Sequence, residues 1–465
     1  MPALHTFAPN TGRAWRLLLA LCLVTHPVEV TTADSWAQWR GPTGTGVGHT
    51  ADPPLHWDET RNIRWKTAIP GLGHSTPVLW GDRLFLTTAL AHGEKLPVHH
   101  EHADGAHDNL EPEQSVKFIA LAVNRQDGEI LWQRTLRDEQ PHEGSHHTGS
   151  WASHSPVADE EHLFVSFGSR GLYCLDHQGR PVWDRDLGDM QTRHGHGEGS
   201  SPALYGDRLI VNWDHQGQSF VTALDKQTGR TLWRQERDEI TSWSTPLIVE
   251  HRGKAQVIIA ATGAVRSYDL ATGEPIWSCR GLSRNVCASP VAADGRVYVT
   301  NNYDWPAMMA IRLDRARGDI TDSDAVIWSI GKYTPYVPSP LLYGDRLYFI
   351  RQMHPYLSCV DAKTGRFIWE AQRLPDVRMV FASPVGAAGR LYVTGRNGIT
   401  LVIRHDDPFE ILATNSLSDS FSASPILAGQ ALYLRGERFL YCITQHNENF
   451  SHTLPITEGK FRKDK

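Results

Sequence analysis

One short element recurs along the chain and constrains its fold more than any other feature. A Ser or Thr followed by Pro and then by an apolar stretch occurs eight times, at Pro77, Pro156, Pro202, Pro246, Pro290, Pro340, Pro384 and Pro425. After a first interval of 79 residues, the copies are 41 to 50 residues apart, which is the length of a four-stranded propeller blade. The repeat therefore predicts an all-β fold, an eight-bladed β-propeller of four-stranded antiparallel blades with an insertion in the first blade.

A hairpin with a fixed pattern follows in most copies. In the clearest one, Asp225 is followed by Gly229 and Trp233, and the same Asp-x-x-Thr-Gly-x-x-x-Trp pattern occupies residues 269–277 and 361–369. We expect the Asp to accept backbone N–H groups of the turn and the Gly to take a positive φ. The Trp is expected to fill the space between wedge-shaped blades.

The two ends of the chain are expected to close the ring. The eighth copy, from Pro425 to Cys442, ends after its third strand, whereas a strand around Trp65 precedes the first copy. That N-terminal strand is predicted to complete the last blade, which leaves no free sheet edge to aggregate.

The first 33 residues have the pattern of an export signal. Arg13 and Arg16 precede the apolar run 17–24, which is too short to span a bilayer, and Ala33 supplies a small residue for cleavage. A lipid anchor at Cys22 is disfavoured because Leu21 precedes it. We expect a periplasmic or extracellular protein with an N-terminal segment (34–60), a propeller (61–446) carrying a His-rich insertion (91–115), and a C-terminal tail (447–465).

The charge composition of the chain limits the classes of binding partner that we expect. The chain has 46 Lys and Arg against 52 Asp and Glu, with a formal net charge of -6, and both signs are mixed throughout. This balance gives no reason to expect nucleic acid or an anionic membrane surface as partner. No later segment resembles a membrane helix, and we expect a monomeric propeller that binds a protein or a small molecule.

The hairpin signature at blade spacing resembles the repeats of pyrroloquinoline quinone (PQQ) dehydrogenases and of BamB, the propeller subunit of the bacterial outer-membrane assembly machine. The opening Trp36-x-x-Trp39-Arg40-Gly41-Pro42 is similar to the start of secreted PQQ-like propellers of planctomycete-type bacteria, most of them without an assigned activity. The resemblance covers the mature chain. The resemblance implies the fold. It does not imply one function, because the same propeller fold is found in enzymes, scaffolds and binding modules.

Function is expected on one face of the ring. In a four-stranded blade, the loop between the second and third strands and the join to the next blade open on the same face of the ring. The segments predicted on this face are residues 91–115, 141–155, 189–201, 213–218, 301–307 and 351–356. These stretches hold most of the 24 histidines. The candidate ligand-binding residues are His74, Trp151, His154, Arg193, His194, His196, Glu198, Asp214, His215 and Trp305.

A subset of these residues could hold a metal ion. His154, His194, His196, Glu198 and His215 offer imidazole and carboxylate groups that suit Zn²⁺, Cu²⁺ or Ni²⁺. The alternative is that the histidines hydrogen-bond backbone groups within turns and that the insertion is a solvated loop, since a His-rich tract is only compositional evidence of metal binding. No His-Glu-x-x-His spacing decides between the two.

Three functions remain open at this stage. The favoured one is a non-catalytic binding or scaffold module that uses the His- and Trp-rich face. The resemblance also implies a quinoprotein oxidoreductase with PQQ and Ca²⁺, which is disfavoured because the sequence has no adjacent Cys pair and no Cys-x-x-Cys-His haem site. The third is a metal-dependent hydrolase or lyase with Glu143 or Glu198 as base. No catalytic residue is assigned.

The cysteine positions allow one disulfide bond as a hypothesis. Cys174, Cys359 and Cys442 occupy equivalent places in three repeats and are predicted to be small core residues. Cys279 and Cys287 flank one short connection, and an oxidising compartment would allow them to pair.

Overall fold

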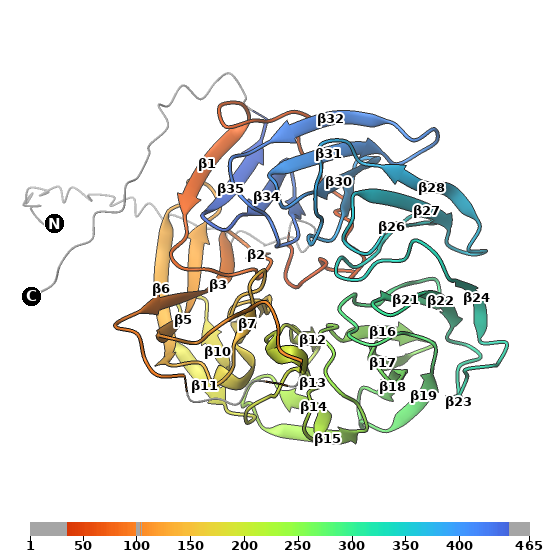
Figure 1. Ribbon diagram of the computed structural model, residues 1–465, viewed down its shortest axis with the longest axis horizontal. Helices are drawn as coiled ribbons and strands as arrows, with labels where there is room; N and C mark the ends of the chain where they lie inside the picture. The colour runs from red at the N-terminus through yellow and green to blue at the C-terminus, as the bar shows by residue number, and fades with distance from the viewer. Residues whose placement is uncertain (1–34, 99–102, 104, 446–465) are drawn as a thin grey trace, which may run out of the picture. The chain divides into compact units, whose positions relative to one another are not determined.

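The computed structural model describes residues 35–98, 103 and 105–445, and the statements below concern these residues. They form nine sheets, of which eight are arranged as blades around a common centre (Figure 1) and the ninth has only two strands. The prediction of an all-β, eight-bladed propeller is confirmed. The predicted export signal, Cys22, the C-terminal tail and His99, His100 and His102 of the insertion lie outside the described residues.

Blades 1 to 4 follow one another along the chain, each running from an innermost to an outermost strand. Blade 1 comprises β2 (Val78–Trp80), β3 (Arg83–His92), β5 (Ser115–Asn124) and β6 (Ile130–Glu139). Blade 2 comprises β8 (Val157–Ala158), β9 (His162–Ser166), β10 (Leu172–Asp176) and β11 (Pro181–Arg185). Blade 3 comprises β12 (Ala203–Tyr205), β13 (Arg208–Trp213), β14 (Ser219–Asp225) and β15 (Thr231–Arg237). Blade 4 comprises β16 (Leu247–His251), β17 (Lys254–Ile259), β18 (Val265–Asp269) and β19 (Pro275–Cys279), with β23 (Gly318–Asp319) added in parallel.

Blades 5 to 8 repeat this order and return to the start of the ring. Blade 5 comprises β20 (Val291–Ala293), β21 (Arg296–Asn302), β22 (Pro306–Arg312) and β24 (Val326–Ile330). Blade 6 comprises β25 (Leu341–Tyr343), β26 (Arg346–Ile350), β27 (Tyr356–Asp361) and β28 (Phe367–Arg373). Blade 7 comprises β29 (Val385–Ala387), β30 (Arg390–Thr394), β31 (Ile399–Arg404) and β32 (Ile411–Ser416). Blade 8 comprises β33 (Ile426–Ala428), β34 (Ala431–Arg435), β35 (Phe439–Thr444) and β1 (Ile63–Ala68).

Ring closure occurs in blade 8, as predicted. Strand β1 pairs antiparallel with β35, with Trp65 opposite Cys442 and Ala68 opposite Phe439. The outermost strand of the last blade is therefore supplied by the N-terminal end of the propeller.

The Ser/Thr-Pro repeat has a physical role that the sequence pattern did not predict. The backbone N–H of each Ser or Thr before the proline donates to the side-chain oxygen of the equivalent residue in the next blade. The ring runs from Thr76 through Ser155, Ser201, Thr245, Ser289, Ser339, Ser383 and Ser424 and back to Thr76, with N···O distances of 2.9 to 3.2 Å. All eight blades are thus joined by one closed circle of hydrogen bonds, at buried positions where an unpaired N–H would be costly.

The hairpin pattern joins the blades at the rim. The indole Nε1 of Trp183 in blade 2 donates to the carbonyl of Lys226 in the hairpin of blade 3, at 2.9 Å. A Cβ at Gly229 in that hairpin would lie 2.8 Å from the Trp183 ring, and Gly229 has φ +67°. Glycine is therefore required both for the turn and for the close approach of the indole, and Asp225 accepts the Thr228 N–H at 2.8 Å.

The N-terminal segment covers one face of the ring. Trp36 pairs with Leu79 in blade 1, and Val47 pairs with Gly386 in blade 7, each beside the turn between the first two strands of its blade. We call this side the turn face and the opposite side, where the joins open, the loop face. The buried Arg40 guanidinium reaches inward and donates to the carbonyls of Pro340 (2.8 Å) and Pro384 (2.7 Å).

The hypothesised disulfide is absent from the structure, in which the five described cysteines are free. The buried Cys279 packs in the core between blades 4 and 5, beside Trp277 and Val297, with its Sγ 3.5 Å from the Arg280 carbonyl. Cys287 instead lies 3.6 Å from the Asn285 carbonyl and contacts the Tyr336 side chain, and burial raises its pKa to about 12. The two thiols face different surroundings. Cys174, Cys359 and Cys442 are buried core residues, as predicted.

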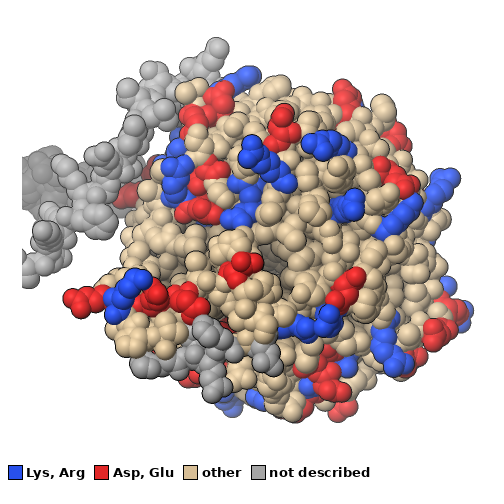
Figure 2. Space-filling model, viewed as in Figure 1, with Lys and Arg blue, Asp and Glu red and all other residues tan. Residues whose placement is uncertain are grey.

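The surface carries no large patch of one charge on the side shown in Figure 2, where basic and acidic residues alternate around a hollow near the middle. Within the described part of the chain, no helix is long and apolar enough to cross a membrane.

Candidate functional site

Three loops from neighbouring blades meet on the loop face. The insertion of blade 1 forms the short strand β4 (Asn109–Leu110), which pairs with β7 (Ser145–His146) in the join to blade 2. The join from blade 2 to blade 3 forms the 3₁₀ turn η3 (Arg193–Gly195), and its His194 carbonyl accepts the Asn109 amide at 2.7 Å. Backbone and side-chain hydrogen bonds therefore hold the three loops to one another.

Five histidines gather where these loops meet, and we call them the imidazole cluster: His107, His146, His147, His194 and His196. The ring centroid of His196 lies 4.8 Å from that of His107, 4.6 Å from His146 and 5.3 Å from His194. The rings of His146 and His147 are 4.4 Å apart. Imidazoles contributed by three separate loops thus form one continuous group.

The cluster favours uncharged rings. Desolvation lowers the pKa of His196 to about 4, and the neighbouring His146 and His107 lower it further in the same sense. Desolvation and then His147 lower the pKa of His146. At neutral pH these two rings are therefore neutral and retain a nitrogen lone pair, which is the form that binds metal ions.

Within the described residues, three side chains stand close enough to hold one metal ion: Asp108, His146 and His147. One potential ligand atom from each lies within 4.8 Å of the others. The Asp108 carbonyl accepts both the backbone N–H (2.7 Å) and the Nδ1 of His147 (3.1 Å). Asp108 and His147 are exposed, and His146 is half-buried.

A small cavity lies beside the cluster, between blades 1 and 2. Its lining includes Glu143, Trp151, His154, Arg170 and Glu198, and it has room for about one water molecule. Burial of the Glu198 carboxyl group raises its pKa to about 7, although the Ser169 N–H and hydroxyl donate to it at 2.8 and 2.5 Å. Burial also raises the pKa of Glu143. The cavity therefore contains a carboxyl pair, one member of which is partly protonated near neutral pH.

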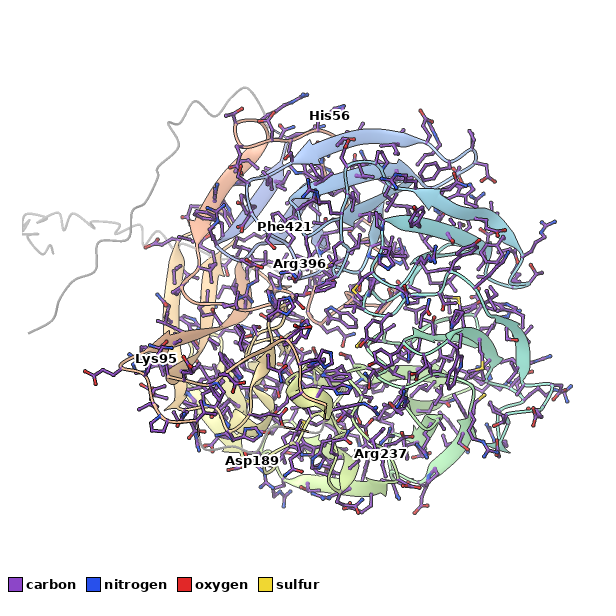
Figure 3. The ribbon with its side chains drawn as sticks, in the orientation of Figure 1. His56, Lys95, Asp189, Arg237, Arg396 and Phe421 are labelled. Carbon is purple, nitrogen blue, oxygen red and sulfur yellow. The ribbon has the colours of Figure 1, made fainter. Side chains whose placement is uncertain are left out.

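Two predicted histidines, His74 and His154, precede the innermost strands of blades 1 and 2. His154 is buried, its Nδ1 has no hydrogen-bond partner among the described residues, and burial lowers its pKa to about 4. Desolvation, then Arg435 and Arg396, lower the pKa of His74 to about 3. Figure 3 shows Arg396 beside the centre of the ring, whereas His56 and Lys95 lie toward its rim. Both histidines are thus neutral in the folded protein.

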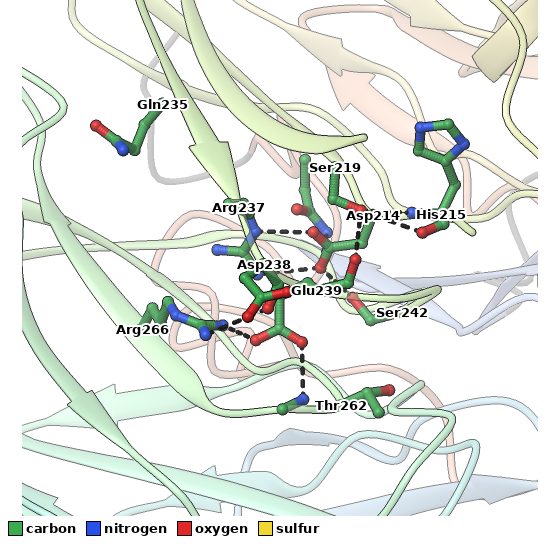
Figure 4. Close-up of polar contacts among 12 residues, drawn as sticks. Asp214, His215, Ser219, Gln235, Arg237, Asp238, Glu239, Ser242, Thr262 and Arg266 are labelled. Carbon is green, nitrogen blue, oxygen red and sulfur yellow. Dashed lines mark hydrogen bonds and ion pairs between the residues drawn. The ribbon is translucent and has the colours of Figure 1, made fainter. Parts of the chain in front are cut away.

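Asp214 is part of a structural network and not of the imidazole cluster. The fully buried Arg237 donates from Nε to Asp214 Oδ1 at 2.8 Å, and the Ser242 hydroxyl donates to Asp214 Oδ2 at 2.6 Å (Figure 4). Glu239 nearby accepts the Gly263 N–H at 2.7 Å and pairs with Arg266. These contacts use the Asp214 carboxylate for packing between blades 3 and 4, so it is not available to a ligand.

His215 also uses its ring within the fold. Its Nδ1 accepts the Gln191 N–H at 3.2 Å, and its Nε2 lies 3.2 Å from the Gln218 carbonyl, to which it donates as the neutral tautomer. This matches the alternative in which histidines hydrogen-bond backbone groups. The predicted metal set is therefore not assembled at one point: His194 and His196 belong to the imidazole cluster, His154 and Glu198 to the cavity, and His215 to its own loop.

The remaining candidates differ in exposure. Trp151 is half-buried and donates to the Glu143 carbonyl at 3.1 Å, so it forms a wall of the cavity. Trp305 is 51% exposed on the loop face of blade 5. The Arg193 Nε donates to His194 Nε2 at 3.1 Å, which ties this arginine to the cluster.

The comparisons with known proteins bear on the whole propeller. A family model described as "Outer membrane protein assembly factor BamB" matches residues 117–371 and 219–447. The chain belongs to this family. BamB of Yersinia pestis is 24% identical over 296 residues, which are 61% of this chain and 66% of that protein.

Quinoproteins form the second group of relatives of this BamB-family chain. Methanol dehydrogenase [cytochrome c] subunit 1 of Methylorubrum extorquens is 33% identical over 99 residues, which are 20% of this chain and only 15% of that protein. The chain thus matches a part of each relative's length, and the relatives' activities are not carried over from these matches.

Solved structures of both groups share the fold. BamB from Moraxella catarrhalis aligns with a TM-score of 0.53 and 16% identity, covering 78% of this chain and 100% of that one. Quinohemoprotein alcohol dehydrogenase from Comamonas testosteroni aligns with a TM-score of 0.60 and 10% identity, covering 94% and 83%. At such identities the likeness shows the fold alone.

The cavity of this family member does not fit the quinone of the second group. It has room for about one water molecule, and its lining includes Glu143 and Glu198. PQQ is a planar molecule of many more atoms than such a cavity admits. No step through PQQ is therefore derived from these residues.

The sequence pattern placed the stretches that contain Asp108, His146 and His147 on the same face but did not select these three residues as a metal set. They appear in the sequence as two ordinary dipeptides, His107-Asp108 and His146-His147, separated by 37 residues. Only the pairing of β4 with β7 brings them together, and β4 is two residues long. Loop-to-loop pairing of this kind has no local sequence signal.

Proposed function

We propose that this chain is an exported binding or scaffold propeller that holds its ligand through the loop face of blades 1 to 3. The observation that carries the proposal is the imidazole cluster, in which side chains from three loops are gathered at a partly exposed surface and held by interloop hydrogen bonds. Membership of the BamB family supports it, because the relative in Yersinia pestis is named as an assembly factor. Export is part of the proposal and rests on the N-terminal sequence pattern.

The two faces of the ring support this choice of surface. On the turn face, the buried Arg40 side chain donates to backbone carbonyls of blades 6 and 7, which directs this cation into the fold and away from solvent. On the loop face, His107 and His147 are exposed, and Asp108 presents a carboxylate. A ligand therefore finds accessible and chemically distinctive groups on the loop face of blades 1 to 3.

The test compares two variants with matched numbers of histidines replaced by Gln. In one, His107, His147 and His194 of the cluster are replaced, and in the other, the exposed His49, His56 and His354 elsewhere on the propeller. We expect proteins of the producing cell's envelope to copurify with wild type and with the second variant, and to be lost from the first. Equal recovery with both variants would show that another surface binds.

A parallel assay addresses the alternative function. The purified chain is incubated with PQQ, Ca²⁺, a primary alcohol and a reducible dye. We expect no dye reduction above the protein-free control. Alcohol-dependent reduction would establish a quinoprotein oxidoreductase in place of a binding module.

A further inference from the structure

We infer that Asp108, His146 and His147 bind one divalent transition-metal ion with the ligand preferences of Zn²⁺, and that this ion presents its open coordination positions to the ligand of the loop face. The inference rests on the proposed function, because it names the chemistry by which that face holds its ligand. It differs from the metal set expected from the sequence, none of whose members belongs to this trio.

The donor atoms have the right types and spacing. Two imidazoles and one carboxylate form a ligand set suited to Zn²⁺ and its neighbours, with metal–ligand distances of about 2.0–2.2 Å. Two ligands of one tetrahedral ion at such distances are about 3.3–3.6 Å apart. The potential ligand atoms here lie within 4.8 Å of one another, so rotations of the exposed Asp108 and His147 side chains that bring these atoms about 1 Å closer complete the site.

The trio is already oriented by neighbouring groups. The Asp108 carbonyl accepts His147 Nδ1 at 3.1 Å, which directs the other ring nitrogen of His147 away from the backbone. The Thr148 hydroxyl lies 2.7 Å from His146 Nδ1, and the Thr148 backbone N–H donates to the same nitrogen at 3.2 Å, so both contacts orient the His146 ring. Metal-bound histidines usually donate their second nitrogen to a carbonyl, as His147 Nδ1 can donate to Asp108 here, which fixes the ring for coordination.

The backbone around the trio supports the same conclusion. Asp108 has φ +56°, a left-handed conformation, and its carbonyl is the acceptor for the His147 N–H at 2.7 Å. The His146 N–H donates to the His196 carbonyl at 3.2 Å. All three ligand residues are thus attached to the paired loops, so little conformational entropy is lost when a metal ion binds.

Three protein ligands leave coordination positions unfilled. A tetrahedral ion held by three side chains keeps one position for water or an incoming group. Because Asp108 and His147 are exposed, that position is accessible from solvent. A carboxylate, imidazole or thiolate of a ligand could then coordinate the ion directly, which gives the loop face a specific mode of recognition.

The experiment uses the untagged mature chain, stripped of metal with a chelator. Isothermal titration with Zn²⁺ measures stoichiometry and affinity, and Co²⁺ absorption in the visible range reports on tetrahedral coordination. The ligand variants are Asp108→Asn and His147→Gln, and the matched control is His354→Gln, which removes an exposed histidine from the loop between β26 and β27.

We expect one Zn²⁺ per chain for wild type and the His354→Gln control, and affinity at least about tenfold weaker for Asp108→Asn and His147→Gln. Thermal melts of the stripped proteins should coincide, which separates loss of ligands from loss of fold. Absence of stoichiometric binding to wild type, or an equal loss in the control, would overturn the metal site.

The outcome for the metal is distinguishable from the outcome for the proposed function. If wild type binds no metal but still copurifies with an envelope partner through the loop face, only the metal inference is wrong. If Zn²⁺ binds with the expected stoichiometry but the cluster variant retains its partners, the binding surface lies elsewhere and the proposed function is wrong.

Discussion

The two faces of this propeller differ in what they present to solvent. On the turn face, Arg40 donates three hydrogen bonds to backbone carbonyls, but its Nε has no partner among the described residues, and burial lowers the pKa of Arg40 to about 9. On the loop face, His154 likewise keeps an unpartnered nitrogen, and burial raises the pKa of Glu198 to about 7. Burial therefore perturbs polar groups on both faces, and the difference is that the loop face also carries the partly exposed imidazole cluster, where a ligand can reach unusual groups.

The largest expected effect is on the turn face. Arg40→Met leaves the carbonyls of Pro340, Pro384 and Thr45 without this donor in a buried place, and should lower the free energy of unfolding by about 3–5 kcal/mol. Denaturant unfolding measures this loss. The control Arg252→Met removes an exposed arginine and should change stability by less than about 0.5 kcal/mol.

If Arg40→Met were as stable as the control, the turn face would not be a structural closure. Loss of partner binding in Arg40→Met at a temperature where the variant is fully folded would also contradict the assignment of function to the loop face alone.

The second effect depends on pH and tests the cavity. Glu198 has a pKa raised from 4.5 to about 7, so the folded state binds its proton more tightly than the unfolded state does. Its contribution to stability is therefore present at low pH and is lost as pH rises from about 4.5 to 7. Glu198→Gln cannot ionise, and its stability relative to wild type should rise across this window by about 3 kcal/mol.

Unfolding curves of both proteins at several pH values between 4 and 8.5 check this prediction. A difference between Glu198→Gln and wild type that stays constant with pH would mean that the Glu198 carboxyl group is not perturbed by burial.

A third, smaller effect concerns the hydrogen-bonded circle that both faces share. Ser339→Ala removes the oxygen that accepts the Ser289 N–H at 2.9 Å and should lower the free energy of unfolding by about 1–2 kcal/mol. Ser339→Thr keeps the hydroxyl, as Thr76 and Thr245 do in other blades, and should cost less. Equal losses for both variants would assign the effect to packing instead.

The smallest expected effect lies in the imidazole cluster. His147 is exposed, so His147→Gln should change the free energy of unfolding of the metal-free protein by less than about 0.5 kcal/mol. A thermal melt measures it. A loss as large as that of Ser339→Ala would show that the cluster, like the turn face, serves the fold.

The fold was predictable because its determinants are local and repeated. The Ser/Thr-Pro step and the Asp225–Trp233 hairpin recur at blade spacing, and each carries its own turn and packing residues. Ring closure through Trp65 followed from counting strands. The hydrogen-bonded circle could not be predicted from the same repeat, because the donor and acceptor of each bond lie in different blades and the sequence pattern does not show which residues are in contact.

The candidate site was predictable only as a region. The sequence placed histidines in loops of blades 1 to 3, and His194 and His196 do meet there. The sequence does not reveal that the Asp214 carboxylate is taken by Arg237, which lies on β15, the outermost strand of the same blade. Contacts between loops depend on a short pairing such as β4 with β7, which leaves no periodic pattern.

The most direct test of the central claim is site-specific photocrosslinking in the producing cell. A photoreactive residue is placed at Thr148 on the loop face or at His49, an exposed position on the turn face. We expect discrete crosslinked partners from position 148 that disappear when His107, His147 and His194 are replaced, and none from position 49. Crosslinks from position 49 alone would contradict this expectation and move the binding surface to the turn face.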